Sequence, residues 1–283
     1  HVVRGKSKLN SRFLYHYLRT FNFIPYLAGG DRAKLTKAKL LEIPIPIPPL
    51  HVQAEIVRIL DTFTELTTEL TTELTARKKQ YNYYRDHLLS FEDGEVEWKT
   101  LGEVFQMRAG QSISTADIMK SPVADFVYPC FGGNGVRGYV NQHSHNGSHL
   151  FIGRQGAQCG NVHRAHGKFF ATEHAVVLTP KDAVNMDWAF HMLTIMNLNQ
   201  YASKSAQPGL AVGRLERLLI PLPPLAEQAR VAAILDKFDA LTNSISEGLP
   251  REIELRQKQY EHYRDMLLSF PSRNDEKTTK GRV

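Results

Sequence analysis

The chain has 283 residues, enough for one or two domains with additional extended elements. Its formal net charge of +6 fits an acidic partner such as nucleic acid but does not establish one. With only two cysteines, Cys130 and Cys159, a disulfide scaffold is excluded, and we expect a cytoplasmic protein. No apolar run reaches the roughly 18 residues that span a bilayer, so we expect no membrane partner. The sequence opens on His1 with no signal peptide, which indicates a fragment or a processed product.

Residues 1–43 repeat later in the chain at an offset of 175 residues. The run Phe13-Leu-Tyr-His-Tyr-Leu18 resembles Trp188-Ala-Phe-His-Met-Leu193, and the same offset relates the two proline motifs at 46–50 and 221–225. A repeat of this kind dominates the fold and must be identified first. His1 falls opposite Val176, and the first copy has no counterpart of residues 93–175. We therefore interpret 1–43 as the C-terminal remnant of a globular domain.

Residues 44–91 combine a proline motif with a long helix. Prolines stiffen the segment 46–50 into an extended form, and a proline directly before a helix is tolerated. Apolar residues then recur every three or four positions, which predicts an amphipathic helix over 51–90. Three consecutive Thr-Glu-Leu-Thr units occupy 64–75 within it. We interpret them as a spacer whose length sets the distance between flanking domains; the alternative is a harmless expansion on a helix surface.

Residues 92–220 have a different texture, with glycines, aromatic residues and short β-branched runs. These features predict short strands separated by glycine turns, and hence a mixed globular domain. The segment 187–198 is expected to be helical.

Residues 221–270 repeat the proline motif and the long helix. Gln53 returns as Gln228, and Asp61 returns as Asp236. Gly248-Leu-Pro250 should kink or break the second helix. Two apolar-striped helices most readily bury each other as an antiparallel pair, although separate cores remain the alternative. The polar tail 271–283 completes an expected α+β fold, with a globular mixed domain on an antiparallel coiled-coil stalk.

Together these features resemble the specificity (S) subunit of type I restriction-modification systems. The motifs that carry the resemblance are the doubled Pro-x-Pro-Pro-Leu box, the glutamine three residues later, Ile-Leu-Asp, and the helix ending in Lys-Gln-Tyr…Tyr-Arg-Asp…Leu-Leu-Ser-Phe. The segment 97–103 also resembles the opening of a recognition domain in that family, and the Thr-Glu-Leu-Thr units resemble its spacer repeats. The match extends to Phe270.

The resemblance implies a non-catalytic subunit that reads double-stranded DNA and needs no cofactor. In this family two target-recognition domains each read one half of a bipartite sequence, and two helical regions bind methyltransferase (M) subunits, which restriction (R) subunits join. On this basis 1–43 is a remnant of the first recognition domain and 92–220 is the second. A chain with one complete domain reads one half-site or dimerises to regain two. Candidate partner-binding residues on the helices are Tyr81, Tyr84, Arg85, Tyr260, Tyr263 and Arg264, with internal helix packing as the alternative.

Two glycine-rich segments are the preferred candidates for DNA contact: Gly132–Gly138, and Gly153-Arg-Gln-Gly156 with Gly160-Asn161. Arginine pairs with guanine and glutamine with adenine through two hydrogen bonds to base edges, and flanking glycines allow close approach. The predicted DNA-binding residues are Asn134, Arg137, Arg154, Gln155, Gly156, Asn161, Lys168, Thr172, Lys204, Ser205 and Gln207. A plain structural loop is the alternative for each segment, and solvated polar groups are the alternative for the lysines.

Other chemistries find weak support in the sequence. Gly132-Gly-Asn-Gly-Val-Arg-Gly138 contains the spacing G-x-G-x-x-G, but a dinucleotide site would need a helix directly after it. Five histidines between 143 and 166 with Cys159 match no standard zinc spacing, so we predict no metal. Methyltransferase, ATP-binding and nuclease signatures are absent, and we therefore expect no catalysis. The rival hypotheses are a metal-dependent nuclease or transferase that uses these histidines, and a structural coiled-coil assembly protein.

Overall fold

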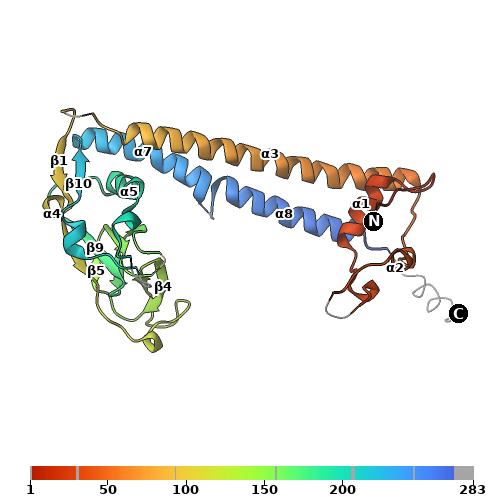
Figure 1. Cartoon of the computed structure of the whole chain (residues 1–283), viewed down its shortest axis with the longest axis horizontal. Helices are drawn as coiled ribbons and strands as arrows, with labels where there is room; N and C mark the ends of the chain where they lie inside the picture. Colours follow the sequence, from red (N-terminus) through yellow and green to blue (C-terminus); the bar gives the residue numbers. More distant parts are fainter. Residues whose placement is uncertain are drawn as a thin grey trace. The chain divides into compact units, whose positions relative to one another are not determined.

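The computed structural model is an α+β protein that divides into two compact units (Figure 1). It describes residues 2–29, 32–92, 94–156, 158–204, 208–244 and 246–270. Unit 1 comprises 1–77 with 241–283, and unit 2 comprises 78–240. The predicted polar tail 271–283 lies outside the described residues.

Unit 1 is helical. Its elements are α1 (Ser11–Thr20), the short helix η1 (Ile24–Tyr26), α2 (Lys37–Leu41), the first part of α3 (Leu50–Leu88) and α8 (Gly248–Leu267). Asn10 starts α1, because its side chain accepts hydrogen bonds from the backbone N–H groups of Arg12 and Phe13. The core of the unit gathers Phe13, Ile56, Leu60 and Leu268, each at most 7% exposed.

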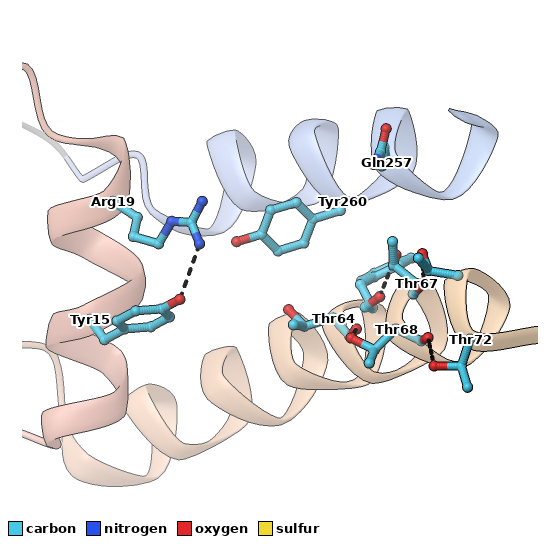
Figure 2. Close-up of a pocket in the computed structure, with 10 residues that line it drawn as sticks. Tyr15, Arg19, Thr64, Thr67, Thr68, Thr72, Gln257 and Tyr260 are labelled. Atoms are coloured by element: carbon cyan, nitrogen blue, oxygen red, sulfur yellow. Dashed lines mark hydrogen bonds between the residues drawn. The ribbon is translucent and has the colours of Figure 1, made fainter. Parts of the chain in front are cut away.

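Helices α3 and α8 run antiparallel within unit 1. Leu268 packs with Ile56 and Leu60, whereas Tyr263 stacks on Phe63 with ring centroids 5.4 Å apart. Further along, Gln257 and Tyr260 lie across a pocket of about 340 Å³ from the threonines of the repeated units (Figure 2). Residue numbers therefore rise along one helix as they fall along the other.

The Thr-Glu-Leu-Thr units lie within one unbroken helix, since α3 runs for 39 residues. Each threonine hydroxyl donates to the carbonyl oxygen four residues earlier, at 2.7 to 3.0 Å. The bonds form a ladder from Thr64 to Thr75, and several are visible in Figure 2. A β-branched threonine is a poor helix former, and this back-bonding satisfies its hydroxyl without solvent. The prediction of a continuous helix here is confirmed.

Unit 2 combines three small sheets with helices. Its strands are β1 (Glu97–Thr100), β2 (Phe105–Ala109), β3 (Tyr128–Gly132), β4 (Gly135–Val140), β5 (His145–Asn146), β6 (His149–Gly153), β7 (Val162–Ala165), β8 (Lys168–Ala171), β9 (Ala175–Pro180) and β10 (Leu219–Leu222). The sheet orders are β1-β10, β2-β9-β6-β7 and β4-β3-β8-β5. Its helices are α4 (Leu101–Val104), η2 (Thr115–Asp117), α5 (Met186–Ile195), η3 (Leu198–Tyr201) and α6 (Val212–Leu215), together with the end of α3 and all but the last three residues of α7 (Leu225–Asn243).

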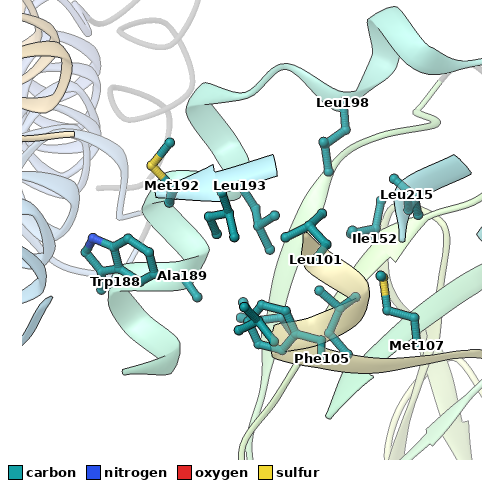
Figure 3. Packing of buried hydrophobic residues seen from close by; sticks show 14 of the residues in the cluster. Leu101, Phe105, Met107, Ile152, Trp188, Ala189, Met192, Leu193, Leu198 and Leu215 are labelled. Atoms are coloured by element: carbon teal, nitrogen blue, oxygen red, sulfur yellow. The ribbon is translucent and has the colours of Figure 1, made fainter. Parts of the chain in front are cut away.

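The main core of unit 2 lies where α5 packs against α4 and the sheet β2-β9-β6-β7. Trp188 and Leu193 of α5 pack in one cluster with Leu101 of α4, each 0% exposed (Figure 3). The same cluster takes in Val231 and Leu235 of α7. Tyr81 and Tyr84 near the end of α3 lie against Phe238 of α7, and Figure 1 shows these two helices running in opposite directions. The predicted combination of a mixed globular domain with antiparallel helices is confirmed.

The second long helix is divided, as Gly248 and Pro250 predict. Helix α7 ends at Asn243 and α8 begins at Gly248, whose φ of 74° favours glycine. Pro250 then occupies the first turn of α8, where its missing N–H costs no hydrogen bond. Among the described helices, none is both long enough and apolar enough to span a membrane.

Candidate functional site

Three loops of unit 2 surround an open polar groove of about 440 Å³. The loops are the β3–β4 turn, the segment after β6 and the β8–β9 turn. The groove is lined by Gly132, Gly133, Asn134, Gly135, Val136, Arg137, Gln155, Gln158 and His174. Most of these residues belong to the two glycine-rich segments that the sequence singles out, so the fold brings both segments to one place.

Glycines allow the loops to pack this closely. A Cβ on Gly153 would lie 2.2 Å from the carbonyl oxygen of Gly133 and 2.6 Å from that of Gln158. A Cβ on Gly160 would lie 2.4 Å from the backbone nitrogen of Asn199, and its φ of 95° also favours glycine. The backbone N–H of Arg154 donates to the carbonyl oxygen of His174 at 2.8 Å. The groove is therefore built on a fixed backbone.

Polar side chains at the groove hold one another in place. The Asn161 amide donates to Asn134 Oδ1 at 3.2 Å and to Gln158 Oε1 at 2.7 Å. His174 Nδ1 lies 2.8 Å from Gln155 Oε1. Amide groups oriented in this way present donors and acceptors together, as the edges of nucleobases require.

The two predicted arginines lie differently. Arg137 is exposed on β4 and donates to Thr115 Oγ1 at 3.1 Å. Arg154 is half-buried, and its guanidinium donates to the carbonyl oxygen of Glu173 at 3.4 Å. Both carry their charge at or beside the groove, where the phosphates or bases of a nucleic acid would be attracted.

The remaining predicted residues divide by exposure. Lys168 on β8 and Lys204 are exposed, and Gly156 has a φ of 84° with open space around it. Thr172 is fully buried beneath the groove, with Oγ1 without a hydrogen-bond partner in the described part, so it offers no surface for DNA. Ser205 and Gln207 lie outside the described residues.

The G-x-G-x-x-G spacing forms a hairpin. β3 ends at Gly132 and β4 begins at Gly135, whose φ is 89°. A strand, rather than a helix, comes after the turn, so the segment lacks the helix that a dinucleotide site would need.

Two of the five histidines stack on aromatic rings in two different sheets, His145 on β5 and His163 on β7. His145 stacks on Phe169 and His163 on Phe151, with centroids 5.2 Å apart in each pair. Burial lowers the pKa of both histidines. Among the described residues, no group of three His, Cys, Asp or Glu side chains could hold a metal ion.

The helical candidates lie partly inside the helix pairs. Tyr84 and Tyr263 stack on Phe238 and Phe63, and they remain 37% and 40% exposed. Tyr81 and Tyr260 are half-buried, and Arg85 and Arg264 lie over their rings at 5.7 Å. The two arginines also pair with Asp86 and Asp265, the next residue in each case. Each set thus packs internally and still presents tyrosine surface to solvent.

An ionic cluster ties β7 to the helices. Its members Asp236 and His191 belong to repeated motifs, but no motif in the sequence marks Arg164. Arg164 of β7 donates to Asp236 of α7 at 2.5 Å and lies 3.4 Å from Asp187 of α5. Its guanidinium covers the ring of Phe190 at 4.1 Å. Burial alone would raise the pKa of Asp236, but hydrogen bonds from Arg164 and His191 lower it overall. The carboxylate is therefore held ionised.

Unit 1 contains the same cluster with one residue exchanged. His16 and Asp61, the counterparts of His191 and Asp236, lie 2.8 Å apart, as do His191 and Asp236. The cation, however, is Arg12, which binds Asp61 at 2.7 Å and covers Tyr15, the counterpart of Phe190, at 4.7 Å. Position 12 corresponds to Asp187. The guanidinium that binds the aspartate thus comes from Arg12 of α1 in unit 1 and from Arg164 of β7 in unit 2.

The repeated glutamines have matching roles. Gln53 accepts from the backbone N–H of Asn10 and donates to the carbonyl of Pro48. Gln228 accepts from Asn185 and donates to Pro223 in the same way. Each glutamine fastens the proline motif to the start of α1 or α5.

Comparison with known proteins agrees with the repeated organisation. A model of the type I restriction modification DNA specificity domain matches residues 1–78 and 94–255. The chain is 62% identical over 220 residues to the Escherichia coli EcoprrI specificity subunit, covering 75% of the chain and 55% of that subunit. It is 42% identical over 304 residues to a putative specificity subunit of Haemophilus influenzae, covering 95% and 75%. The match thus spans just over half the length of the E. coli relative.

Two solved structures share the fold. The S subunit of a type I system from M. genitalium superposes with a TM-score of 0.64 at 16% identity, covering 94% of this chain and 74% of that one. The HsdS subunit from Thermoanaerobacter tengcongensis gives a TM-score of 0.54 at 20% identity, covering 92% and 69%.

Proposed function

The chain belongs to the family of type I restriction-modification DNA specificity subunits, and we propose that it reads one half of a bipartite sequence in double-stranded DNA. The groove of unit 2 is the surface we assign to this reading. Some residues of this surface would contact base edges and others would contact phosphates. Only the contacts to base edges read the sequence.

The polar groove is the observation that carries this proposal. Amide and guanidinium groups converge there on loops that glycines allow to pack closely, and residues at opposite loops are linked by hydrogen bonds. We assign base reading to Asn134, Arg137, Arg154, Gln155 and Asn161. Lys168 and Lys204 are assigned as phosphate contacts, because flexible exposed lysines attract phosphate without reading sequence.

We further propose that the helices bind the catalytic partners. The tyrosine surfaces around Tyr84 and Tyr263 would dock methyltransferase subunits, which restriction subunits then join. Their equivalent placement on Phe238 and Phe63 supports two similar docking sites. Tyr81, Tyr260, Arg85 and Arg264 would support these surfaces from beneath.

In this proposal the chain itself performs no catalysis and needs no cofactor. The named relatives are specificity subunits, and two of the candidate histidines, His145 and His163, stack on aromatic rings. Chelator-sensitive cleavage or methylation by the purified chain alone would instead support the nuclease or transferase alternative. Binding that ignores sequence, in the presence of the methyltransferase subunit, would support a purely structural role.

The experiment compares DNA binding by the chain assembled with its methyltransferase subunit. Arg154→Ala should weaken binding to the cognate half-site by about 1–3 kcal/mol and leave non-specific binding nearly unchanged. Arg217→Ala is the matched control, because Arg217 is an exposed arginine of unit 2 that lies between α6 and β10, outside the three loops that surround the groove, whereas Arg154 lies within one of those loops. Equal losses on cognate and non-cognate DNA would rule out base reading by Arg154.

A further inference from the structure

The amide side chains that line the unit 2 groove use their oxygen atoms within the hydrogen-bond network. Asn134 and Gln158 both accept from the Asn161 amide, at 3.2 and 2.7 Å. The oxygen of Gln155 lies 2.8 Å from His174 Nδ1. Because an amide oxygen can only accept, His174 Nδ1 carries the proton and donates to Gln155. Each of the three lining amides therefore has its oxygen engaged.

The nitrogen atoms of the same amides remain available. In the described part of the chain, the side-chain NH2 groups of Asn134, Gln155 and Gln158 have no hydrogen-bond partner. All three residues are exposed and line the groove. Arg137 also lines it, and its guanidinium has N–H groups beyond the one that donates to Thr115 Oγ1. The exposed polar surface of the groove is therefore rich in N–H donors.

A carboxylate beside the network does not add a free acceptor. Glu173 Oε2 is buried, and Glu173 Oε1 lies 3.5 Å from His174 Nε2. Donors and acceptors thus meet inside the network, but the acceptors of these side chains are engaged within the protein. What the side chains leave for a ligand is mainly donors.

A surface of donors selects among base pairs. In the major groove guanine presents two neighbouring acceptors, N7 and O6, whereas adenine presents its N7 acceptor beside the N6 donor. Paired hydrogen bonds from one amide to adenine need both a free oxygen and a free nitrogen, and in Gln155 the oxygen is engaged. The A·T minor groove also presents acceptors, but it does not distinguish A·T from T·A and so cannot supply a defined sequence.

An aliphatic side chain favours a base over a phosphate as the bound group. Val136 lines the groove and is 53% exposed. Base edges are read by apolar contacts as well as by hydrogen bonds, whereas a phosphate gains nothing from a neighbouring valine. The mixture of N–H donors with one aliphatic surface therefore fits the edge of a base.

We propose that this groove reads guanine in the major groove of DNA, through hydrogen bonds from its lining amides to N7 and O6. Gln155 and Gln158 are specificity-determining residues in this reading, and Gln158 belongs to no motif that the sequence singles out. His174 is a positioning residue, because it holds the oxygen of Gln155 and leaves the nitrogen for the base. The inference rests on the proposed function, since it names the base that the same surface reads.

The first experiment changes the DNA. The chain is assembled with its methyltransferase subunit, and binding is measured to duplexes in which each purine of the cognate half-site is replaced in turn by its 7-deaza analogue. The replacement removes the N7 acceptor and keeps the base pair. At a guanine read by the groove, binding should weaken about fivefold or more, and exchange of that guanine for adenine should weaken it about tenfold or more.

The second experiment reverses the hydrogen-bonding character of one side chain. Gln155→Glu replaces the free N–H donors with a carboxylate oxygen, and the carboxylate can still accept from His174. At the sensitive position, binding should then favour cytosine, whose N4 donates, and the effect of 7-deazaguanine should disappear. Gln106→Glu is the matched control, because it makes the same change at an exposed residue of β2, outside the three loops. It should retain the preference for guanine.

A third comparison tests the positioning role of His174. His174→Ala frees the oxygen of Gln155, so the preference for guanine over adenine should fall about fivefold. His174→Asn should retain the preference, because its Nδ2 can donate in place of the imidazole Nδ1. Both results are ratios between two DNA duplexes, so a general loss of folded protein does not change them.

The outcomes separate this inference from the proposed function. A parent chain that prefers its half-site, but is sensitive to 7-deaza replacement at adenine alone or at no purine, would overturn the guanine assignment and leave DNA reading intact. Guanine preference that persists in Gln155→Glu would overturn reading by the amide donors. A parent that binds all duplexes equally would overturn both proposals.

Discussion

The ion pair of Arg164 can be tested with a second substitution, Asp187→Arg. We expect Asp187→Arg to lower the stability of the parent protein and to raise the stability of the Arg164→Ala variant. Arg164→Ala removes the cation from Asp236 and from the face of Phe190. Asp187→Arg places an arginine where Arg12 stands in unit 1, and there Arg12 already binds the counterparts of Asp236 and Phe190. The double variant therefore transplants the unit 1 arrangement into unit 2.

The size of the effect can be worked from exposure. Breaking a fully buried ion pair costs about 3–5 kcal/mol and breaking an exposed pair at most about 1 kcal/mol. Arg164 and Asp236 are 24% and 35% exposed, so the ion pair should contribute about 2 kcal/mol once solvent screening is allowed for. For a unit of this size, that loss lowers the unfolding midpoint by about 5 °C.

The assay is a double-mutant cycle measured by thermal and denaturant unfolding. Alone, Asp187→Arg should destabilise, because it sets a second guanidinium against Arg164. In the Arg164→Ala background it should stabilise and recover about half of the loss or more. A double variant no more stable than Arg164→Ala would refute the equivalence of the two clusters.

The same double variant distinguishes the contribution of Arg164 to folding stability from its contribution to the position of β7. In the parent the arginine of the cluster comes from β7, whereas in the double variant it comes from α5. With stability recovered, β7 would no longer be tied to α5 and α7 through this cluster. Half-site discrimination by the assembled complex should therefore fall while its unfolding midpoint stays near that of the parent. Discrimination that recovers together with stability would limit Arg164 to a structural role.

Two further predictions concern the helices and the buried histidines. Deleting one Thr-Glu-Leu-Thr unit, residues 68–71, shortens α3 by about 6 Å and rotates the remainder of the helix by roughly 40°. In a complex that reads two half-sites, the preferred spacing between them should therefore change by about 1–2 base pairs. An unchanged spacing would retire the spacer hypothesis in favour of a neutral expansion. Burial lowers the pKa of His191 and of His16 despite their carboxylate partners. The unfolded chain therefore takes up protons first as the pH falls below about 6.5, and stability should decrease from there downward. His191→Gln should reduce this loss between pH 7.5 and 5.5 in denaturant unfolding, and an identical loss would show that the decline comes from other groups.

The repeated parts of this fold are well predicted from sequence, because two copies in one chain constrain each other. The offset of 175 residues pairs His16 with His191 and Asp61 with Asp236, and the structure gives each pair the same contact. Proline and glycine chemistry predicts the break before Gly248. The repeat does not reveal the structural role of Gln53 and Gln228. Their hydrogen bonds are to backbone atoms, which leave no pattern in the sequence.

Residues without a counterpart are harder to assign from sequence. Arg164 belongs to the stretch that only one copy contains, and its partners lie 23 and 72 residues away in sequence, so no local spacing marks it. Thr172 borders a predicted strand, and sequence alone does not distinguish an outward from an inward side chain there; its 0% exposure results from the packing of β8 and β9. The glycine segments are recognisable individually, but their meeting at one groove depends on the sheet pairings.

Mapping methylated bases in the DNA of cells that carry this chain with its methyltransferase subunit tests the central claim most directly. We predict one defined sequence, methylated only when the chain is present, in which Arg154→Ala relaxes a single position. Methylation at the same sites without the chain, or at no consistent sequence with it, would contradict the assignment of DNA reading to this protein.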